Sequence, residues 1–148
     1  MIFIPEEEYV SLIKKIPIFC IDLLILQEQK FLLVKRKHNP MKNEWWFPGG
    51  RLRYRESLDD CFLRIIRNEL GLMINIKSAN LFAFNNYLFD SEYNSRALHT
   101  PAITFCLRCK SNLNPILDEH HSEYCWTNKL PKNFLDSYTY INKSLLID

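Results

Sequence analysis

Glycine is scarce in this sequence: only three of the 148 residues are glycine, at positions 49, 50 and 71. This scarcity excludes glycine-rich linkers and low-complexity tracts. Aromatic residues, by contrast, make up 14% of the chain. Few glycines and many aromatics favour a compact, well-packed domain, and the length predicts a single domain over residues 1–148.

Long hydrophobic runs and a strong charge of one sign are also lacking. No apolar run approaches the roughly 20 residues of a membrane span. The first eight residues lack the basic and then apolar order of a secretory signal. A net charge of +2 is too small to favour nucleic acid or a membrane surface as a partner. The five cysteines are odd in number and irregularly spaced, which indicates reduced thiols. We therefore expect a cytoplasmic protein that binds neither nucleic acid nor membrane.

The strongest local pattern that is present runs from Gly50 to Leu72. Ser57 is a good N-cap residue, because its hydroxyl can accept a hydrogen bond from an amide of the first helical turn. Acidic residues follow in that turn, where the helix dipole favours them, and Gly71 suits the left-handed position after the last turn. Apolar residues recur between these signals at helical spacing: Leu58, Cys61, Phe62, Ile65, Ile66 and Leu70. The pattern predicts one amphipathic helix.

Glu69 lies on the apolar side of this helix. At about 100° per residue, it points within roughly 20° of Leu58. A carboxylate on a buried face is costly unless a cation or hydrogen-bond donors meet it. Two interpretations follow: an arginine such as Arg51 or Arg64 pairs with Glu69, or Glu69 binds a metal ion.

The rest of the chain predicts a mixed sheet with helices. We expect helices at Pro5 to Lys15 and from Asn133 onward, and a polar loop around Ser91 to Arg96. The expected strands are Ile18 to Leu26, Lys30 to Lys35, Trp45 to Phe47, Leu81 to Phe89, Ile103 to Lys110 and Tyr124 to Trp126. The predicted fold is therefore an α/β (α+β) sandwich, a mixed sheet with flanking helices.

Two further features stand out within these elements. Asp22 interrupts an apolar strand, so it is either a site residue or an acid bonded to nearby amides; both readings stay open. Pro48-Gly49-Gly50 predicts an irregular backbone that can offer carbonyl oxygens inward.

The spacing of seven residues resembles the Nudix hydrolase box: Gly50, Glu56, Arg64, Ile66, Glu69, Gly71 and Leu72. The box usually carries glutamate at two positions where this chain has Ile65 and Asn68. The same loss of glutamates from the box is seen in the GDP-mannose mannosyl hydrolase branch, which the chain resembles nearly throughout its length. The resemblance implies the Nudix fold, Mg²⁺ (with Mn²⁺ possible), a nucleotide-sugar substrate and a homodimer.

The resemblance also implies the residues around the metal. The Gly49 backbone carbonyl, the Glu69 carboxylate and His120 are the implied metal ligands, and His121 is the implied general base. His120 stands where the branch has glutamine, and imidazole is a softer ligand that favours Mn²⁺ over Mg²⁺. Glu56 is expected to orient Arg64 through a salt bridge. Without the resemblance, the pair of histidines in a loop before Tyr124 would be a solvated surface feature.

The remaining implied residues face the substrate. Arg36 and Arg51 match arginines that neutralise the departing GDP, and arginine suits phosphate because its fork binds two oxygens at once. Asp22 matches an aspartate that faces the sugar. The chain departs from the branch at Tyr87, where a histidine is usual, and at Ala102, where a tyrosine is usual.

Together these residues predict Mg²⁺-dependent hydrolysis of a GDP-mannose-like nucleotide sugar to nucleoside diphosphate and free sugar, by attack at the anomeric carbon. One alternative is a general Nudix pyrophosphohydrolase of nucleotide sugars or nucleoside triphosphates, and another is a non-catalytic nucleotide-sugar-binding domain. A rival zinc site at Cys106 and Cys109 is disfavoured, because residues three apart on a strand face opposite sides.

Overall fold

The computed structural model describes residues 4–74, 79–89, 98–110 and 112–146. Its helices agree closely with the sequence prediction near the N-terminus and after Ser57. The elements, in chain order, are α1 (Glu6–Ile13), β1 (Cys20–Gln27), β2 (Lys30–Arg36), β3 (Trp45–Trp46), β4 (Gly49–Arg51), α2 (Leu58–Leu70), β5 (Ala79–Phe89), β6 (Leu98–Arg108), β7 (His121–Thr127), α3 (Lys132–Ser137), β8 (Tyr138–Ile141) and the 3₁₀ helix η1 (Lys143–Leu146).

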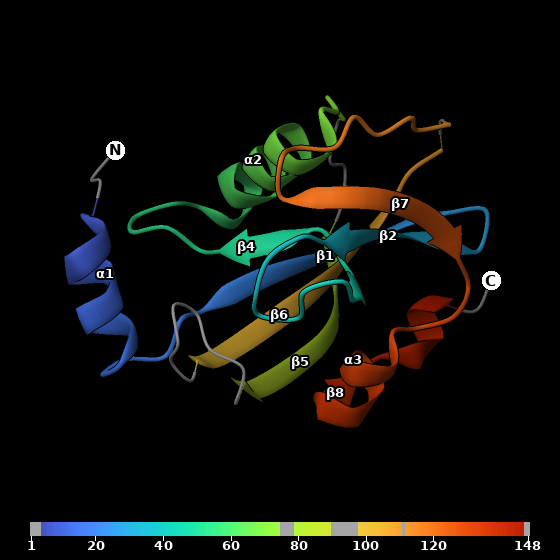
Figure 1. Ribbon diagram of the computed structural model, residues 1–148. Coiled ribbons are helices and arrows are strands. Elements are labelled where there is room, and N and C mark those ends of the chain that lie inside the picture. The colour runs from blue at the N-terminus through green and yellow to red at the C-terminus, as the bar shows by residue number, and fades with distance from the viewer. Residues whose placement is uncertain (1–3, 75–78, 90–97, 111, 147–148) are drawn as a thin grey trace.

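The strands form one mixed sheet in the order β3-β2-β1-β6-β5-β8, with β4 added to β1 and β7 added to β2. Strands β1 and β6 are parallel, and the other pairs are antiparallel. Helix α2 covers one face of the sheet, and α3 lies toward the other (Figure 1). The predicted mixed-sheet sandwich with flanking helices is therefore confirmed. No helix in the described ranges is long and apolar enough to cross a membrane.

Side chains of β1 alternate between two hydrophobic cores. Ile21, Leu23 and Ile25 pack with the buried stripe of α2, whereas Leu24 and Leu26 pack in the core that contains Phe134 of α3. This is the period-two alternation of a strand buried on both faces. The same alternation separates Cys106 from Cys109, which pack in opposite cores, so the rival zinc pair does not form.

The ends of α2 follow the sequence signals. The Ser57 hydroxyl accepts a hydrogen bond from the Asp60 amide at 3.2 Å, and Gly71 adopts the left-handed conformation with φ 62°. Between these ends, five apolar side chains of the helix are buried. The predicted helix and both of its caps are confirmed.

Strand β1 changes partner along its length. Near the hairpin it pairs with β2 at Leu26 and Gln27, but Cys20, Ile21 and Asp22 pair with the residues of β4 instead. The Leu23 amide bridges this change by donating to the Pro48 carbonyl at 2.8 Å. The expectation of an irregular backbone at Pro48-Gly49-Gly50 was therefore wrong at the glycines, because edge pairing with β1 holds Gly49 and Gly50 in a short strand.

Other boundaries also differ from the sequence prediction. The tail after Asn133 is not only helical: β8 follows α3 and pairs with β5. His121, expected in a loop, is the first residue of β7 and lies opposite Arg36 of β2. The loop expected around Ser91 to Arg96 lies outside the described residues.

Candidate active site

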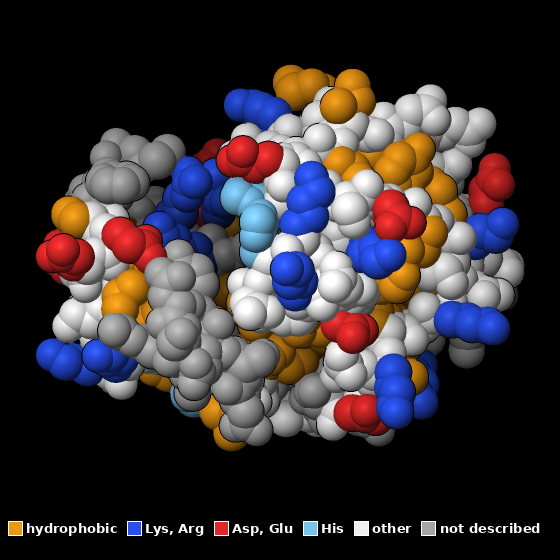
Figure 2. Space-filling view, in the orientation of Figure 1, with side chains coloured by type: hydrophobic (Ala, Val, Ile, Leu, Met, Phe, Trp, Pro, Cys, Tyr) orange, Lys and Arg blue, Asp and Glu red, His pale blue; other side chains and the backbone are white. Residues whose placement is uncertain are grey.

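A cavity of about 280 Å³ opens where β1 separates from β2. We call it the arginine cavity, because Arg36 and Arg51 both line it. Asp22 and Gly49 also line it, so four of the seven expected site residues, far apart in sequence, meet around one hollow. Figure 2 shows basic, acidic and histidine side chains meeting on one face of the molecule.

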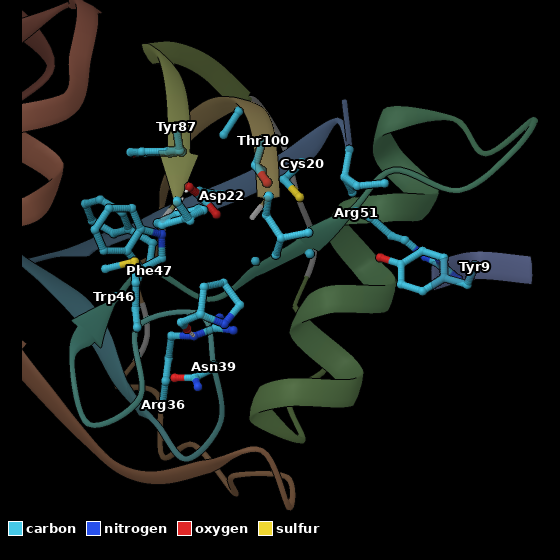
Figure 3. A pocket seen from close by; sticks show the side chains of 18 residues that line it. Tyr9, Cys20, Asp22, Arg36, Asn39, Trp46, Phe47, Arg51, Tyr87 and Thr100 are labelled. Atoms are coloured by element: carbon cyan, nitrogen blue, oxygen red, sulfur yellow. Dashed lines mark hydrogen bonds between the residues drawn. The ribbon is translucent and has the colours of Figure 1, made fainter. Parts of the chain in front are cut away.

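The cavity has two chemically different ends (Figure 3). Tyr9 of α1 and Arg51 lie at one end, with the Arg51 guanidinium carbon 4.7 Å from the centre of the Tyr9 ring. Trp46 and Tyr87 lie at the other end, with Asp22 beside them. An elongated ligand in this cavity would thus meet Arg51 and the Tyr9 ring at one end, and the Trp46 and Tyr87 rings with Asp22 at the other, where Arg36 lies on the Trp46 side.

Asp22 is a buried acid on the face of the sheet opposite α2. Its Oδ2 accepts a hydrogen bond from Trp46 Nε1 at 3.3 Å. Burial raises the pKa of its carboxyl to about 7, against the hydrogen bond from Trp46 and the charge of Arg36. Asp22 lines the cavity and bonds to an indole, and no hydrogen bond from a backbone amide to Asp22 is present among the described residues.

Gly49 lies between two acids. Its amide donates to Glu69 Oε2 at 3.1 Å, while a side chain at this position would collide with Asp22 Oδ1 and come within 2.7 Å of the Ile21 carbonyl. Only glycine fits here, because β1 and β4 pack their backbones against the Asp22 side chain. The Gly49 backbone therefore packs against Asp22 of the cavity and donates a hydrogen bond to Glu69 of α2.

Glu69 is nearly buried, with 15% of its side chain exposed. Burial raises the pKa of its carboxyl to about 8, and the charges of Asp118 and Asp22 act in the same direction. Neither Arg51 nor Arg64 forms an ion pair with it among the described residues. A buried carboxylate with one amide donor and no cationic partner is chemically suited to a divalent cation.

Arg64 has a different partner, as expected from the sequence. It donates two hydrogen bonds to the Glu56 carboxylate, from Nε at 2.5 Å and from Nη2 at 2.7 Å. These bonds hold the pKa of Glu56 at about 2. Arg64 Nη2 also donates to the Arg51 carbonyl at 3.0 Å. The predicted salt bridge is confirmed, and it anchors the backbone that carries Arg51 into the cavity.

His121 is buried at the start of β7, beside Glu69. Its Nδ1 lies 2.7 Å from Asp118 Oδ1, and its Nε2 lies 4.0 Å from Glu69 Oε2. Burial lowers the pKa of the ring, although the hydrogen bond with Asp118 opposes this shift. A neutral ring that donates from Nδ1 to Asp118 leaves Nε2 free to accept a proton, which is the arrangement of an oriented general base.

His120 lies differently from its neighbour. Its side chain is 62% exposed, and its ring meets the His38 ring edge-on at 5.7 Å. Within the part of the chain that is described, no three His, Cys, Asp or Glu side chains gather closely enough to hold a metal by themselves. His121 is in contact with Asp118 at 2.7 Å and lies 4.0 Å from Glu69, whereas His120 is exposed at the surface.

Several contributors were not assigned a role from the sequence. Asp118 orients His121 and also accepts the His120 amide at 3.0 Å; an aspartate that bonds a backbone amide two residues later is an Asx turn, which the sequence could have signalled. Trp46 binds Asp22 across 24 residues, a long-range pairing with no local signal. Tyr87 and Ala102 both line the cavity, while the side chain of His99 bonds Asn86 at 2.7 Å.

A family model described as NUDIX domain matches residues 19–129 of the chain. The protein belongs to the Nudix family. The resemblance seen in the box around α2 is thereby confirmed, and the match also includes the cavity residues of β1, β2 and β4 and the His121 strand. Tyr9 and α3 lie outside the matched Nudix segment.

Relatives and a solved structure agree with the Nudix assignment. The low-salt glycan biosynthesis protein Agl8 of Haloferax volcanii is 35% identical over 89 residues, covering 60% of this chain and 56% of that protein. An ADP-ribose pyrophosphatase of Methanocaldococcus jannaschii is 37% identical over 62 residues, covering 42% and 37%. The chain therefore matches about half or less of each relative's length. A MutT NUDIX hydrolase from Burkholderia pseudomallei superposes with a TM-score of 0.66 at 25% identity, covering 80% of this chain and 89% of that one.

Proposed function

We propose that this Nudix protein hydrolyses a nucleotide sugar at the anomeric carbon and releases a nucleoside diphosphate and free sugar. One observation carries the proposal: the cavity presents two arginines and a buried aspartate, while the C-terminal half of α2 offers a single carboxylate, Glu69. Ile65 is buried in the core and Asn68 is exposed, so neither adds a metal-binding acid. A site poor in carboxylates is better suited to stabilising a leaving diphosphate than to building a metal-bound nucleophile.

Arg36 and Arg51 would bind the diphosphate that leaves. Both guanidinium groups belong to the lining of one cavity, and each side chain is held by a backbone or ring contact: Arg36 Nε donates to the Pro40 carbonyl at 2.8 Å, and Arg51 stacks on Tyr9. Such preorganised cations stabilise negative charge as it develops on the leaving group.

His121 would take a proton from the attacking water through Nε2, with Asp118 holding the ring by Nδ1. Asp22 would face the sugar. Once ionised, its carboxylate favours the positive charge that grows on the ring in an oxocarbenium-like transition state. These roles would put the proton acceptor on β7 and the leaving-group cations on β2 and β4, with His121 opposite Arg36 in the β2–β7 pair.

The residues present fit a divalent metal, because Glu69 is a buried carboxylate without a cationic partner among the described residues. The Gly49 carbonyl, the Glu69 carboxylate and His120 would hold Mg²⁺, or Mn²⁺ given the softer imidazole. When bound, the ion supplies Lewis-acid stabilisation of the leaving diphosphate.

A GDP-mannose-like substrate, a homodimer and a cytoplasmic location belong to the same proposal. The mannosyl hydrolase resemblance supports the first two, and five free cysteines are consistent with the third. A second candidate function is pyrophosphate cleavage of a nucleotide sugar or nucleoside triphosphate. The similarity to an ADP-ribose pyrophosphatase over 62 residues favours it.

The position of the broken bond separates these candidates. The reaction is run in ¹⁸O-labelled water with Mg²⁺ on a panel of nucleotide sugars, and the products are weighed by mass spectrometry. The proposal expects the label in the sugar, with unlabelled nucleoside diphosphate. Label in a phosphate product would replace it with the pyrophosphohydrolase.

A further inference from the structure

A second hollow of about 320 Å³ adjoins the arginine cavity. We call it the acidic recess. The two hollows share Met41, Trp46, Tyr87 and Phe89, so the aromatic end of the arginine cavity is also the wall of the recess. A ligand that extends past Trp46 and Tyr87 would enter the recess.

The charges of the two hollows are opposite. Arg36 and Arg51 line the arginine cavity, whereas the recess carries two carboxylates, Glu44 and Asp136, and no basic residue among its lining. Phosphate would be repelled from such a surface, while hydroxyl or ammonium groups would be attracted to it. Carboxylate acceptors beside aromatic rings suit a hydroxylated ring, because the hydroxyls donate hydrogen bonds and the apolar ring face packs on the aromatics.

The Tyr87 hydroxyl gives an independent sign of a missing partner. Tyr87 is 5% exposed, its ring packs edge-on against Trp46 at 5.4 Å, and its hydroxyl has no hydrogen-bond partner among the described residues. Buried hydroxyls are normally satisfied, and an unsatisfied one needs an explanation. Tyr87 belongs to the wall between the two hollows, where a polar group of a ligand could form the missing hydrogen bond with its hydroxyl.

We propose that the acidic recess is the glycosyl subsite, and that it accepts neutral or amino sugars and rejects anionic ones. The inference rests on the proposed function, because it assigns the nucleoside diphosphate to the arginine cavity. It makes Glu44, Asp136 and Tyr87 the residues that determine sugar specificity. The nucleotide lies toward Tyr9 and Arg51, the anomeric centre beside Asp22, and the sugar ring beyond Trp46.

Binding measured without turnover tests this assignment. The protein is titrated calorimetrically in a chelator with UDP, UDP-glucose and UDP-glucuronate, and with GDP, GDP-mannose and GDP-mannuronate. We expect the neutral sugar nucleotide of one set to bind about tenfold more tightly than its uronate, a difference typical of one hydrogen bond to a charged group. Equal affinity for the two sugars, or no gain over the diphosphate alone, overturns the assignment.

Variants test which residues discriminate between neutral and anionic sugars. Glu44→Gln with Asp136→Asn should reduce the preference for the neutral sugar to less than about threefold, while Glu123→Gln, which removes an exposed acid paired with Lys35 on β7, should leave it unchanged. If the double variant discriminates as well as the wild type, the recess is not the subsite.

Tyr87→Phe provides a test in which stability and binding move in opposite directions. Removing an unpartnered buried hydroxyl should keep or raise the melting temperature of the free protein. The same change should weaken neutral-sugar nucleotide binding several-fold and leave nucleoside diphosphate binding unaltered. Equal weakening of both ligands would assign Tyr87 a merely structural role.

Hydrolysis assays separate this inference from the proposed function. If the wild type in Mg²⁺ releases no free sugar but still discriminates between the sugars, the reaction is wrong and the subsite stands. If it releases free sugar equally well from neutral and uronate substrates, the reaction stands and the subsite is wrong.

Discussion

Replacing Glu69 by glutamine should stabilise the metal-free protein at pH 8 while abolishing metal-dependent turnover. The carboxyl is 15% exposed, and burial raises its pKa from 4.5 to about 8. At 1.36 kcal/mol for each pKa unit, ionising Glu69 in the folded state costs up to roughly 5 kcal/mol relative to the unfolded chain. Glutamine keeps the shape and can still accept the Gly49 amide, without the buried charge.

The direction with pH follows from which state holds the proton. Below pH 4.5 both states are protonated, and Glu69 has no effect on the free energy of unfolding. Between about pH 4.5 and 8 the folded protein holds a proton that the unfolded chain has lost, so stability falls as the pH rises. Asp22 acts in the same direction, because its pKa is raised from 3.8 to about 7.

Urea unfolding of the wild type, Glu69→Gln and the control Glu123→Gln in chelator, at pH values from 5 to 8.5, measures this effect. The Glu69→Gln variant should lose most of the decline above pH 6, and adding Asp22→Asn should remove most of the decline that remains. At pH 8, millimolar Mg²⁺ should stabilise the wild type but not Glu69→Gln, because the variant lacks the only charged ligand of the proposed site. If the single variant declines with pH as steeply as the wild type, Glu69 does not carry the buried charge inferred here.

Three further predictions test the backbone, the base and the residue that orients the base. Gly49→Ala should lower the free energy of unfolding, measured in urea, by about 1–3 kcal/mol, because its methyl group would lie 2.7 Å from the Ile21 carbonyl. The control Gly50→Ala, whose nearest contact is at 3.8 Å, should cost less than about 1 kcal/mol, on the order of ordinary surface changes. Equal losses in the two variants would refute the close-contact argument. His121→Ala should slow turnover by about 10²–10⁴-fold, and a loss below about threefold would remove it as the base. Asp118→Asn should lower turnover less and move the acidic limb of kcat/KM to lower pH, since Asp118 raises the pKa of His121, the base that must be unprotonated.

Signals between residues close together in the sequence predicted helix α2 and the position of Glu69 on it. The cap at Ser57, the left-handed Gly71 and the apolar stripe between them fixed α2 to within a residue or two, because a helix closes its hydrogen bonds within four residues. The position of Glu69 on that stripe identified a buried acid before its surroundings were known. The Glu56 salt bridge to Arg64, eight residues away, was also within reach of the sequence.

What the sequence could not predict depends on contacts between distant segments. β8 is a run of only four strand-favouring residues directly after α3, too short to separate from the predicted helix, and pairing with β5 about 55 residues earlier holds it extended. Gly49 and Gly50 are extended because β1 leaves β2 and accepts a new edge partner, which no local pattern records. The same is true of Trp46 on Asp22 and of Tyr9, which reaches the cavity from the N-terminal helix.

The placement of Gly49 between two acids has a consequence for how ligands communicate. Asp22 and Glu69 each raise the energy of the other's ionised form, and Asp22 contributes to the raised pKa of Glu69. A cation that neutralises Glu69 therefore eases ionisation of Asp22, and a substrate that favours ionised Asp22 opposes protonation of Asp22 while it favours a proton or a cation at Glu69. Thermodynamic linkage makes this influence reciprocal: an ion that tightens the hold on the sugar must itself be held more tightly when the sugar is present. Electrostatic coupling between the two acids on either side of Gly49 is thus enough to make the two halves of the site cooperative without any movement of the chain.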